Sequence, residues 1–324
     1  LLVAMAPFKQ GTSLLLAPRL TSWLRPRYQT SSSFVLSRSL TSRDPIREDG
    51  DTAGAFILPQ TLNKSRQREY GAAVEYGRLL GRLIGDSTAF ARATRRLRPF
   101  DISDRLTRAG TFDLAAFDPD LGFQLALGGL DRFLRAQGAS ALGASEVRTT
   151  TFQSGAELPF GMSFQLGYAR SRTNRFQRTT EGYLTSETFQ REWPKGTFRL
   201  TRAIHGFPVA LVGVGATFRQ VRGSTTVPNP GALPYLSRQR SRTVTPDAQF
   251  TLTNGMVLSV TWANVAQRNL ANGNRTQVDQ NDLTAGFSHA FALPGALSRT
   301  RRVIRSQLTG ILSKSLSCLR LSTE

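Results

Sequence analysis

Apolar and polar residues alternate along much of this chain, most clearly around Asn254-Gly255. Before this dipeptide, apolar residues from Ala248 to Leu252 alternate with glutamine and threonine, and after it Met256 to Trp262 alternate with mostly small residues. Successive side chains of a β-strand point to opposite faces, so each half predicts a strand with one apolar face. Asn-Gly favours a two-residue type I′ turn, which joins the two strands as a hairpin.

The same alternation recurs at 121–127, 162–169 and 283–291. Segments of about 10 residues with this pattern are typical of transmembrane β-barrels. Helical spacing predicts two short helices, at 78–97 and 131–137. The predicted strands, separated by glycine, proline and asparagine turn signals, are 27–40, 67–78, 98–110, 120–130, 145–157, 160–173, 195–205, 207–222, 240–254, 255–270 and 279–293.

The predicted fold class is all-β, an antiparallel transmembrane β-barrel segment with long strands and short helical loops. Residues 26–293 form the barrel wall, with about 11 strands, between a loop or leader at 1–25 and an irregular tail or truncated loop at 294–324. The chain begins with Leu1, and we expect it to be a fragment of a longer polypeptide. Residues 1–43 also have the composition of a mitochondrial transit peptide, although they already alternate like a strand.

Composition excludes some classes of protein and leaves others open. Cys318 is the one cysteine, which excludes a disulfide framework within the chain. The chain has no run of 18 apolar residues, so a transmembrane helix is not predicted. The net charge of +20 comes almost entirely from arginine. Segments 170–178 and 219–242 are expected to be water-exposed connections at a phosphate-rich membrane rim. Dispersed arginines without a recognised module argue against specific nucleic-acid binding.

Three segments carry a resemblance to a known family. The first is Thr111–Phe123 together with Leu127–Leu134. The second is Leu158–Tyr168, a turn that leads into a strand, and the third is Arg191–Leu200, in which Trp193-Pro194 opens a strand. They resemble the SprA family, giant outer-membrane proteins of gliding and type IX secreting bacteria, and the resemblance covers roughly residues 25–300. It implies a very wide single-chain barrel through which folded cargo leaves the cell, with plug and lateral-gate partners. This chain is too short for the whole barrel and lacks the family's closing strand, which ends in an aromatic residue.

Signals for catalysis are few. His205 and His289 lie far apart in the sequence, and Gly213-Val-Gly215 fits a strand bulge or close backbone approach better than a dinucleotide site. Two acidic groups fit Ca²⁺ ligands, but solvated loops or turn caps, especially Asp118, suit them better. These groups are Asp44, Glu48, Asp49 and Asp51, and then Asp113, Asp118 and Asp120. We predict no enzyme activity, cofactor or metal.

The predicted functional residues lie on the two faces of the strands. The residues expected to face lipid are Phe164, Leu166, Phe250, Leu252, Leu258, Val260, Trp262 and Phe287. The residues expected to face an aqueous lumen are Ser163, Gln165, Thr251, Ser259, Thr261 and Ser288. Small polar side chains on that face suit a channel for bulky cargo, whereas a narrow selective pore would carry charged rings.

The predicted function is a structural part of a large pore for protein export in the bacterial outer membrane, of the type IX secretion and gliding kind. Its expected partners are outer-membrane lipid and lipopolysaccharide and the remaining strands of the parent chain. The resemblance adds plug or gate proteins and exported cargo. Two alternatives remain: a smaller porin or receptor-type outer-membrane barrel, and a soluble basic β-protein that binds nucleic acid or a membrane surface.

Overall fold

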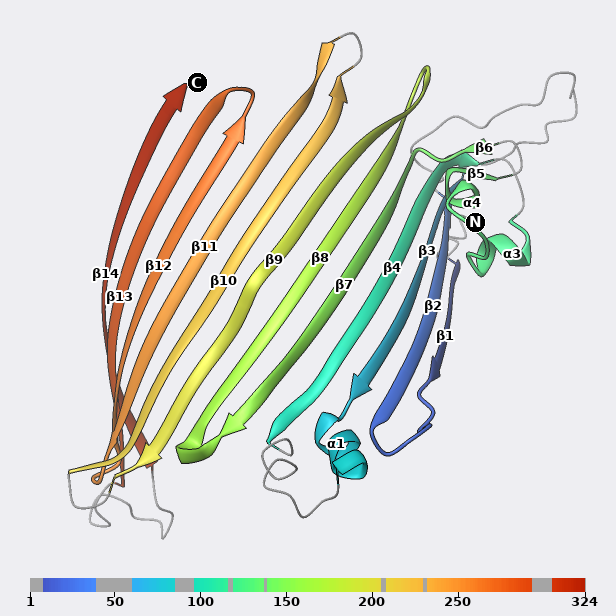
Figure 1. Cartoon of the computed structure of the whole chain (residues 1–324). Helices are drawn as coiled ribbons and strands as arrows, with labels where there is room; N and C mark the ends of the chain where they lie inside the picture. The colour runs from blue at the N-terminus through green and yellow to red at the C-terminus, as the bar shows by residue number, and fades with distance from the viewer. Residues whose placement is uncertain are drawn as a thin grey trace, which may run out of the picture.

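The described part of the chain forms one broad antiparallel sheet. This structure, a computed structural model, describes residues 8–38, 60–84, 96–115, 119–136, 139–204, 208–229, 232–292 and 305–323. In these residues a 12-stranded sheet follows the order of the chain, with β1 and β14 at its two edges (Figure 1). Its strands are β1 Phe8–Leu16, β2 Leu24–Arg38, β3 Gln60–Val74, β4 Leu97–Ala115, β7 Gly143–Leu158, β8 Met162–Thr179, β9 Gly182–Ala203, β10 Val209–Asn229, β11 Ala232–Leu252, β12 Met256–Ala271, β13 Asn274–Ala292 and β14 Arg305–Thr323.

The fold class predicted from the alternation is confirmed in its all-β, antiparallel character. Beyond β1, the strands of the main sheet run from 15 residues in β2 to 22 in β9. Such strands are far longer than the 5–6 residues usual in soluble sheets. The other elements are short: α1 Tyr76–Ile84, α3 Leu121–Gln124, α4 Asp131–Leu134, the 3-10 turn η1 Pro159–Gly161, and the small pair β5 Arg135–Ala136 and β6 Ala139–Ser140. No pairing between β1 and β14 occurs in the described residues.

The sheet extends further at both ends than the sequence pattern predicts. Residues 1–25 are predicted as a loop or leader, but β1 lies within them and pairs with β2. Residues 294–324 are predicted as an irregular tail, but they contain β14, which pairs with β13. Basic residues interrupt the apolar register there, as with Lys314 opposite Leu283. The neighbouring strand offers its backbone N–H and C=O groups whatever the side chains are, so pairing overrides the weak pattern.

The predicted strand at 120–130 is wrong, because α3 forms there. The Asp120 carboxylate accepts a hydrogen bond from the Phe123 backbone N–H at 2.7 Å, which caps the first turn. Phe123 within α3 and Ala126 just after it are buried. Four alternating apolar residues are too short a run to separate a strand from a helical turn. The helix predicted at 78–97 is present as α1, with residues 85–95 outside the described residues and Leu97 already in β4. The helix predicted at 131–137 is present as α4, which is followed by β5, and residue 137 lies outside the described residues.

A small hydrophobic core lies where α3 and α4 cover one end of β2, β3 and β4. Phe34, Leu62 and Phe112 are fully buried there, and Phe123 packs among them. The Lys64 ammonium lies 3.8 Å from the centroid of the Phe123 ring and donates a hydrogen bond to the Arg132 carbonyl. The helical insertion is therefore held on the sheet by aromatic packing and a buried cation.

The Asn254-Gly255 hairpin forms, but its turn differs from the type I′ turn that we predict. The loop has three residues, and of these Gly255 has a positive φ, 82°. The Gly255 N–H donates to the Leu252 carbonyl at 3.0 Å, as in a type I turn closed by a left-handed residue. The two-residue type occurs instead between β12 and β13, where Asn272 and Gly273 both have positive φ.

Candidate functional site

The sheet has two chemically different faces, and its hydrogen-bonded register assigns each residue to one of them. Residues directly opposite one another in an antiparallel pair lie on the same face. Phe250 lies opposite Leu258, which lies opposite Phe287 on the next strand. Phe164 lies opposite Phe198 in the same way. We call the face with these residues the belt face and the other the polar face.

An apolar belt crosses the belt face at the end of the sheet that holds the β7–β8 and β11–β12 turns. Along β12 it runs from Met256 to Trp262, about 20 Å at ~3.4 Å per residue. At the β7–β8 turn it continues into the exposed side chains of Leu158 and Phe160. On β7 to β13 the apolar belt includes Phe152, Phe164, Leu166, Tyr168, Phe198, Leu200, Val212, Val214, Phe218, Val244, Phe250, Leu252, Leu258, Val260, Leu283 and Phe287.

Nothing in the described residues covers this belt. Trp262, Leu283 and Phe287 are 47%, 48% and 40% exposed, although they sit in the middle of paired strands. Every buried hydrophobic side chain of the described residues lies between Phe34 and Ala144. The strands from β8 to β14 therefore have long paired backbones but no packed core of their own.

Aromatic rings mark the edge of the belt on β4 to β9. The ring centroids of Phe100 and Phe152 lie 5.7 Å apart, those of Phe152 and Tyr168 lie 5.1 Å apart, and Trp193 is 6.3 Å from Tyr168. The Arg191 guanidinium lies 5.5 Å from the Tyr168 ring centroid, on the side away from the belt. The border thus passes from aliphatic to aromatic to cationic side chains within a few residues.

The sequence predicts that Trp193-Pro194 opens a strand, but the pair lies inside β9 at a bulge. The register between β8 and β9 shifts between Gly167 and Ala169, so two residues of β9 oppose Tyr168 alone. A bulge tolerates proline, because the inserted residue does not need to donate a hydrogen bond to the neighbouring strand. At the bulge, Trp193 contacts the aromatic rings of Phe152 and Tyr168. The position of a bulge cannot be read from the alternation of residues in the sequence.

Beyond this border, the same belt face becomes rich in arginine. Arg170 lies opposite Arg191, which lies opposite Arg222. The arginine-rich segments 170–178 and 219–242 are predicted as connections, and this is wrong for their described residues, which extend β8, β10 and β11. The arginines alternate with serine, threonine and glutamine, which are compatible with a strand that continues past the belt.

Many of the arginines on β4 to β9 are paired with acidic residues. On the belt face, Arg148 contacts Asp104 at 3.0 Å and Arg172 contacts Glu187 at 2.7 Å. Arg108 and Glu146 pair in the same way, at 2.6 Å. These ion pairs are at least partly exposed to solvent, so each contributes little to stability. Their main effect is to cancel charge on this half of the sheet.

The polar face carries small and hydroxylated residues together with a few paired charges. Gly215 allows a close approach between strands, because an added Cβ would lie 2.4 Å from the Asp247 carboxylate. Glu192 accepts hydrogen bonds from Arg219, and the Lys195 ammonium lies 3.5 Å from it. The charges on this face are thus held within the sheet, where the sequence pattern indicates only small polar groups.

The register separates the predicted site residues as the alternation indicates. Those expected to face lipid (Phe164, Leu166, Phe250, Leu252, Leu258, Val260, Trp262 and Phe287) share the belt face. Those expected to face a lumen (Ser163, Gln165, Thr251, Ser259, Thr261 and Ser288) share the polar face. What each face contacts stays a prediction.

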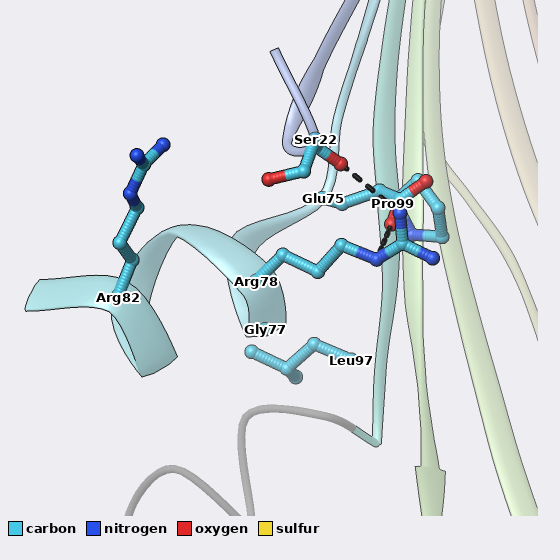
Figure 2. A pocket seen from close by; sticks show the side chains of 7 residues that line it. All are labelled: Ser22, Glu75, Gly77, Arg78, Arg82, Leu97 and Pro99. Atoms are coloured by element: carbon cyan, nitrogen blue, oxygen red, sulfur yellow. Dashed lines mark hydrogen bonds and ion pairs between the residues drawn. The ribbon is translucent and has the colours of Figure 1, made fainter. Parts of the chain in front are cut away.

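A cavity of about 740 Å³ lies where α1 meets the start of β4. Glu75 stands beside it, and Arg78 bridges the Glu75 carboxylate at 2.7 Å and the Ser22 carbonyl at 3.1 Å (Figure 2). Arg25 contacts the same carboxylate at 2.7 Å. Arg82 lies apart from this group (Figure 2). Among the described residues, the ion pairs and the hydrogen bond of Arg78 at this cavity tie the β1–β2 turn to α1.

The remaining candidates from the sequence lie apart from one another. Asp113 accepts a hydrogen bond from Thr61 at 3.0 Å, while Asp120 caps α3. His289 lies on the belt face opposite Met256, and Cys318 is exposed on β14. The candidates outside the described residues are His205, Asp44, Glu48, Asp49, Asp51 and Asp118.

Two searches of the described residues found nothing. They contain no group of three or more histidine, cysteine, aspartate or glutamate side chains placed to hold a metal ion. They also include no helix with the length and apolar character needed to cross a membrane.

Comparisons with known proteins add little. No family model matches the sequence, and no curated protein matches it either. A solved structure, the β domain of the Bordetella autotransporter Brka, aligns with 94% of this chain and 100% of its own length, at 6% identity and a TM-score of 0.25. A similarity of this size supports no conclusion about function.

Proposed function

We propose that this chain forms part of the wall of a β-barrel in a bacterial outer membrane, with a structural rather than a catalytic role. The apolar belt faces lipid, and the polar face lines an aqueous interior. The observation that carries the proposal is the uncovered belt, which continues across β7 to β13, with Arg202 opposite Val212 at its end.

Physical chemistry favours lipid as the cover of this belt. In water, a contiguous apolar patch of this size promotes aggregation or needs a second layer of protein. A bilayer covers it directly, because outer-membrane barrels carry an outward apolar band about 25 Å tall with aromatic residues at its borders. The belt along β12 is about 20 Å long at ~3.4 Å per residue, and Tyr168 and Trp193 lie at its edge on β8 and β9.

The backbone adds a requirement at the edges of the sheet. In lipid, unpaired N–H and C=O groups are costly, so strands cross a membrane only in a closed barrel. The outer edges of β1 and β14 therefore need partners, and we propose that further strands of the same barrel supply them.

A finer form of the proposal is a pore for protein export of the type IX secretion and gliding kind. The resemblance of Thr111–Phe123, Leu158–Tyr168 and Arg191–Leu200 to the SprA family supports it. Small side chains such as Gly213, Gly215 and Thr261 on the polar face also support it, because they offer little grip on bulky cargo. Plug or gate proteins and exported cargo are partners in this form of the proposal.

The orientation of the two faces can be tested by moving one tryptophan across the sheet. The variant Trp23→Phe/Trp193→Phe keeps Trp262 as its single tryptophan, on the belt face. After reconstitution into vesicles with brominated acyl chains, its fluorescence should be strongly quenched, because bromine quenches tryptophan at contact distance.

The matched control adds Trp262→Phe and Ala263→Trp, which moves the ring by one residue to the polar face. Its fluorescence should be little affected by the brominated chains. Equal quenching of the two variants would contradict the proposed orientation. A soluble, lipid-free protein that binds oligonucleotides would favour the basic soluble alternative instead.

A further inference from the structure

Five arginines gather on the belt face of β10 to β13, beyond the apolar belt. They line a groove of about 520 Å³, within the range of about 300–1,000 Å³ usual for ligand pockets. We call this the arginine groove: Arg222, Arg238, Arg240, Arg268 and Arg275.

The register places three of these charges in direct opposition. Arg222 lies opposite Arg240, and Arg240 lies opposite Arg268, so like charges face each other across three neighbouring strands. Such pairs destabilise a sheet. The arrangement is favourable when an anion lies among the guanidinium groups and accepts their hydrogen bonds.

No acidic side chain supplies that anion within the part of the chain that the structure describes. None of the five arginines makes an ion pair there, in contrast to Arg148 and Arg172 on the same face of β7 and β8. The acidic residue of β13 on this face, Asp279, accepts a hydrogen bond from Gln277 at 2.7 Å. In the described residues the positive charge is therefore partly cancelled on β4 to β9, where Arg170 and Arg191 make no ion pair, and left uncancelled in the arginine groove.

The position of the groove indicates the kind of anion. Arg240 lies four residues along β11 from Val244 of the belt, about 13 Å at ~3.3 Å per residue. A ligand that spans both surfaces needs phosphate or carboxylate groups beside acyl chains. Arginine forks bind phosphate with two parallel hydrogen bonds, so phosphate suits the groove well.

We infer that the arginine groove binds the phosphate groups of a phosphorylated glycolipid of the outer leaflet, with its acyl chains on the apolar belt beside Trp262 and Leu283. This inference rests on the proposed function, because it needs the belt face to meet lipid.

The test compares two triple variants of the reconstituted chain. Arg222→Gln/Arg240→Gln/Arg268→Gln removes charge from the groove, and Arg108→Gln/Arg148→Gln/Arg172→Gln removes equal charge from paired arginines on the same face. The probe is diphosphorylated lipid A in detergent micelles, with dephosphorylated lipid A as its comparison. The groove variant should lose about tenfold or more in affinity for the phosphorylated lipid, and the control should stay within about twofold.

Several results would overturn the inference. Equal loss in both triple variants would mean that binding follows net charge alone. Equal affinity for the two lipids would exclude phosphate recognition. Displacement of the lipid by the same concentration of inorganic phosphate, or by a short oligonucleotide, would identify a general anion site without lipid contact.

A folding control keeps these outcomes interpretable. Each variant is checked for heat-modifiable migration in gel electrophoresis. If the triple groove variant fails to fold, Arg240→Lys is used instead, because lysine keeps the charge but cannot form two parallel hydrogen bonds. This variant should bind the lipid more weakly than the parent, and unchanged binding would contradict the inference.

The inference and the proposed function can fail separately. If Trp262 is quenched by brominated lipid but removal of the phosphate groups from lipid A has no effect on binding, this inference alone fails. If Trp262 is not quenched, the proposed function fails with it.

Discussion

Leu258 and Ser259 are neighbours in the chain but belong to opposite surfaces of the sheet. Leu258 lies opposite Phe250 and Phe287, within the belt, while Ser259 lies opposite Gln249 and a glycine of β13 on the polar face. The chemical demand on each residue therefore depends on its face, and a shift of one position reverses it.

An arginine at each of these positions should have very different effects. Leu258→Arg should destabilise the membrane-inserted protein by about 2–4 kcal/mol, because the charge would lie in hydrocarbon, and Ser259→Arg should cost little. Urea unfolding in lipid vesicles measures both changes in free energy. Equal tolerance of the two arginines would contradict the assignment of faces.

Among the elements, the α3–α4 insertion is attached to the sheet at identifiable contacts. A Cβ on Gly110 of β4 would lie 2.7 Å from the Phe133 carbonyl oxygen of α4. The Tyr183 hydroxyl of β9 shares its one hydrogen between the Leu134 carbonyl at 2.7 Å and the Ala141 carbonyl at 3.0 Å. In addition to the aromatic packing and Lys64, the insertion is therefore held by one close backbone approach and by one side chain from a distant strand.

Gly110→Ala should displace α4, because a backbone carbonyl is in the way, and should cost about 1–3 kcal/mol. Gly213→Ala is the matched control, since a Cβ there would meet nothing closer than 3.8 Å. Limited proteolysis between residues 119 and 136 measures the effect. Cleavage should accelerate in Gly110→Ala alone, and equal rates in the two variants would show that the close approach does not hold α4.

At the scale of the whole molecule, the sheet has two unpaired edges and an uncovered belt in the described residues. Both features favour association with other chains or with lipid over a soluble monomer.

In plain buffer, the isolated chain should therefore aggregate or lack β-structure, and detergent should restore β-structure. Circular dichroism and sedimentation test this together. Any binding of nucleic acid should fall steeply with salt, because it would rest on contacts between arginines and phosphates, which release counterions. A monodisperse, cooperatively melting monomer in plain buffer would contradict the barrel proposal.

The long, strongly alternating strands were predictable from sequence, and the elements with short or broken patterns were not. The alternation at Met256–Trp262 predicts β12 and both of its faces. The helix α3 was missed, because Asp120 and a buried Phe123 decide between strand and helix, and burial depends on distant residues. β14 was missed because its pairing with β13 outweighs its irregular side-chain pattern.

The alternation of residues along the chain was enough to predict an antiparallel all-β protein with one apolar and one polar register. That follows because the side-chain period of a strand is a local property of the backbone. The pairing of strands in the folded sheet was needed to show that Arg222, Arg240 and Arg268 form one row and that the belt is uncovered in the described residues. Lateral pairing joins residues far apart in the chain, and no local pattern records it.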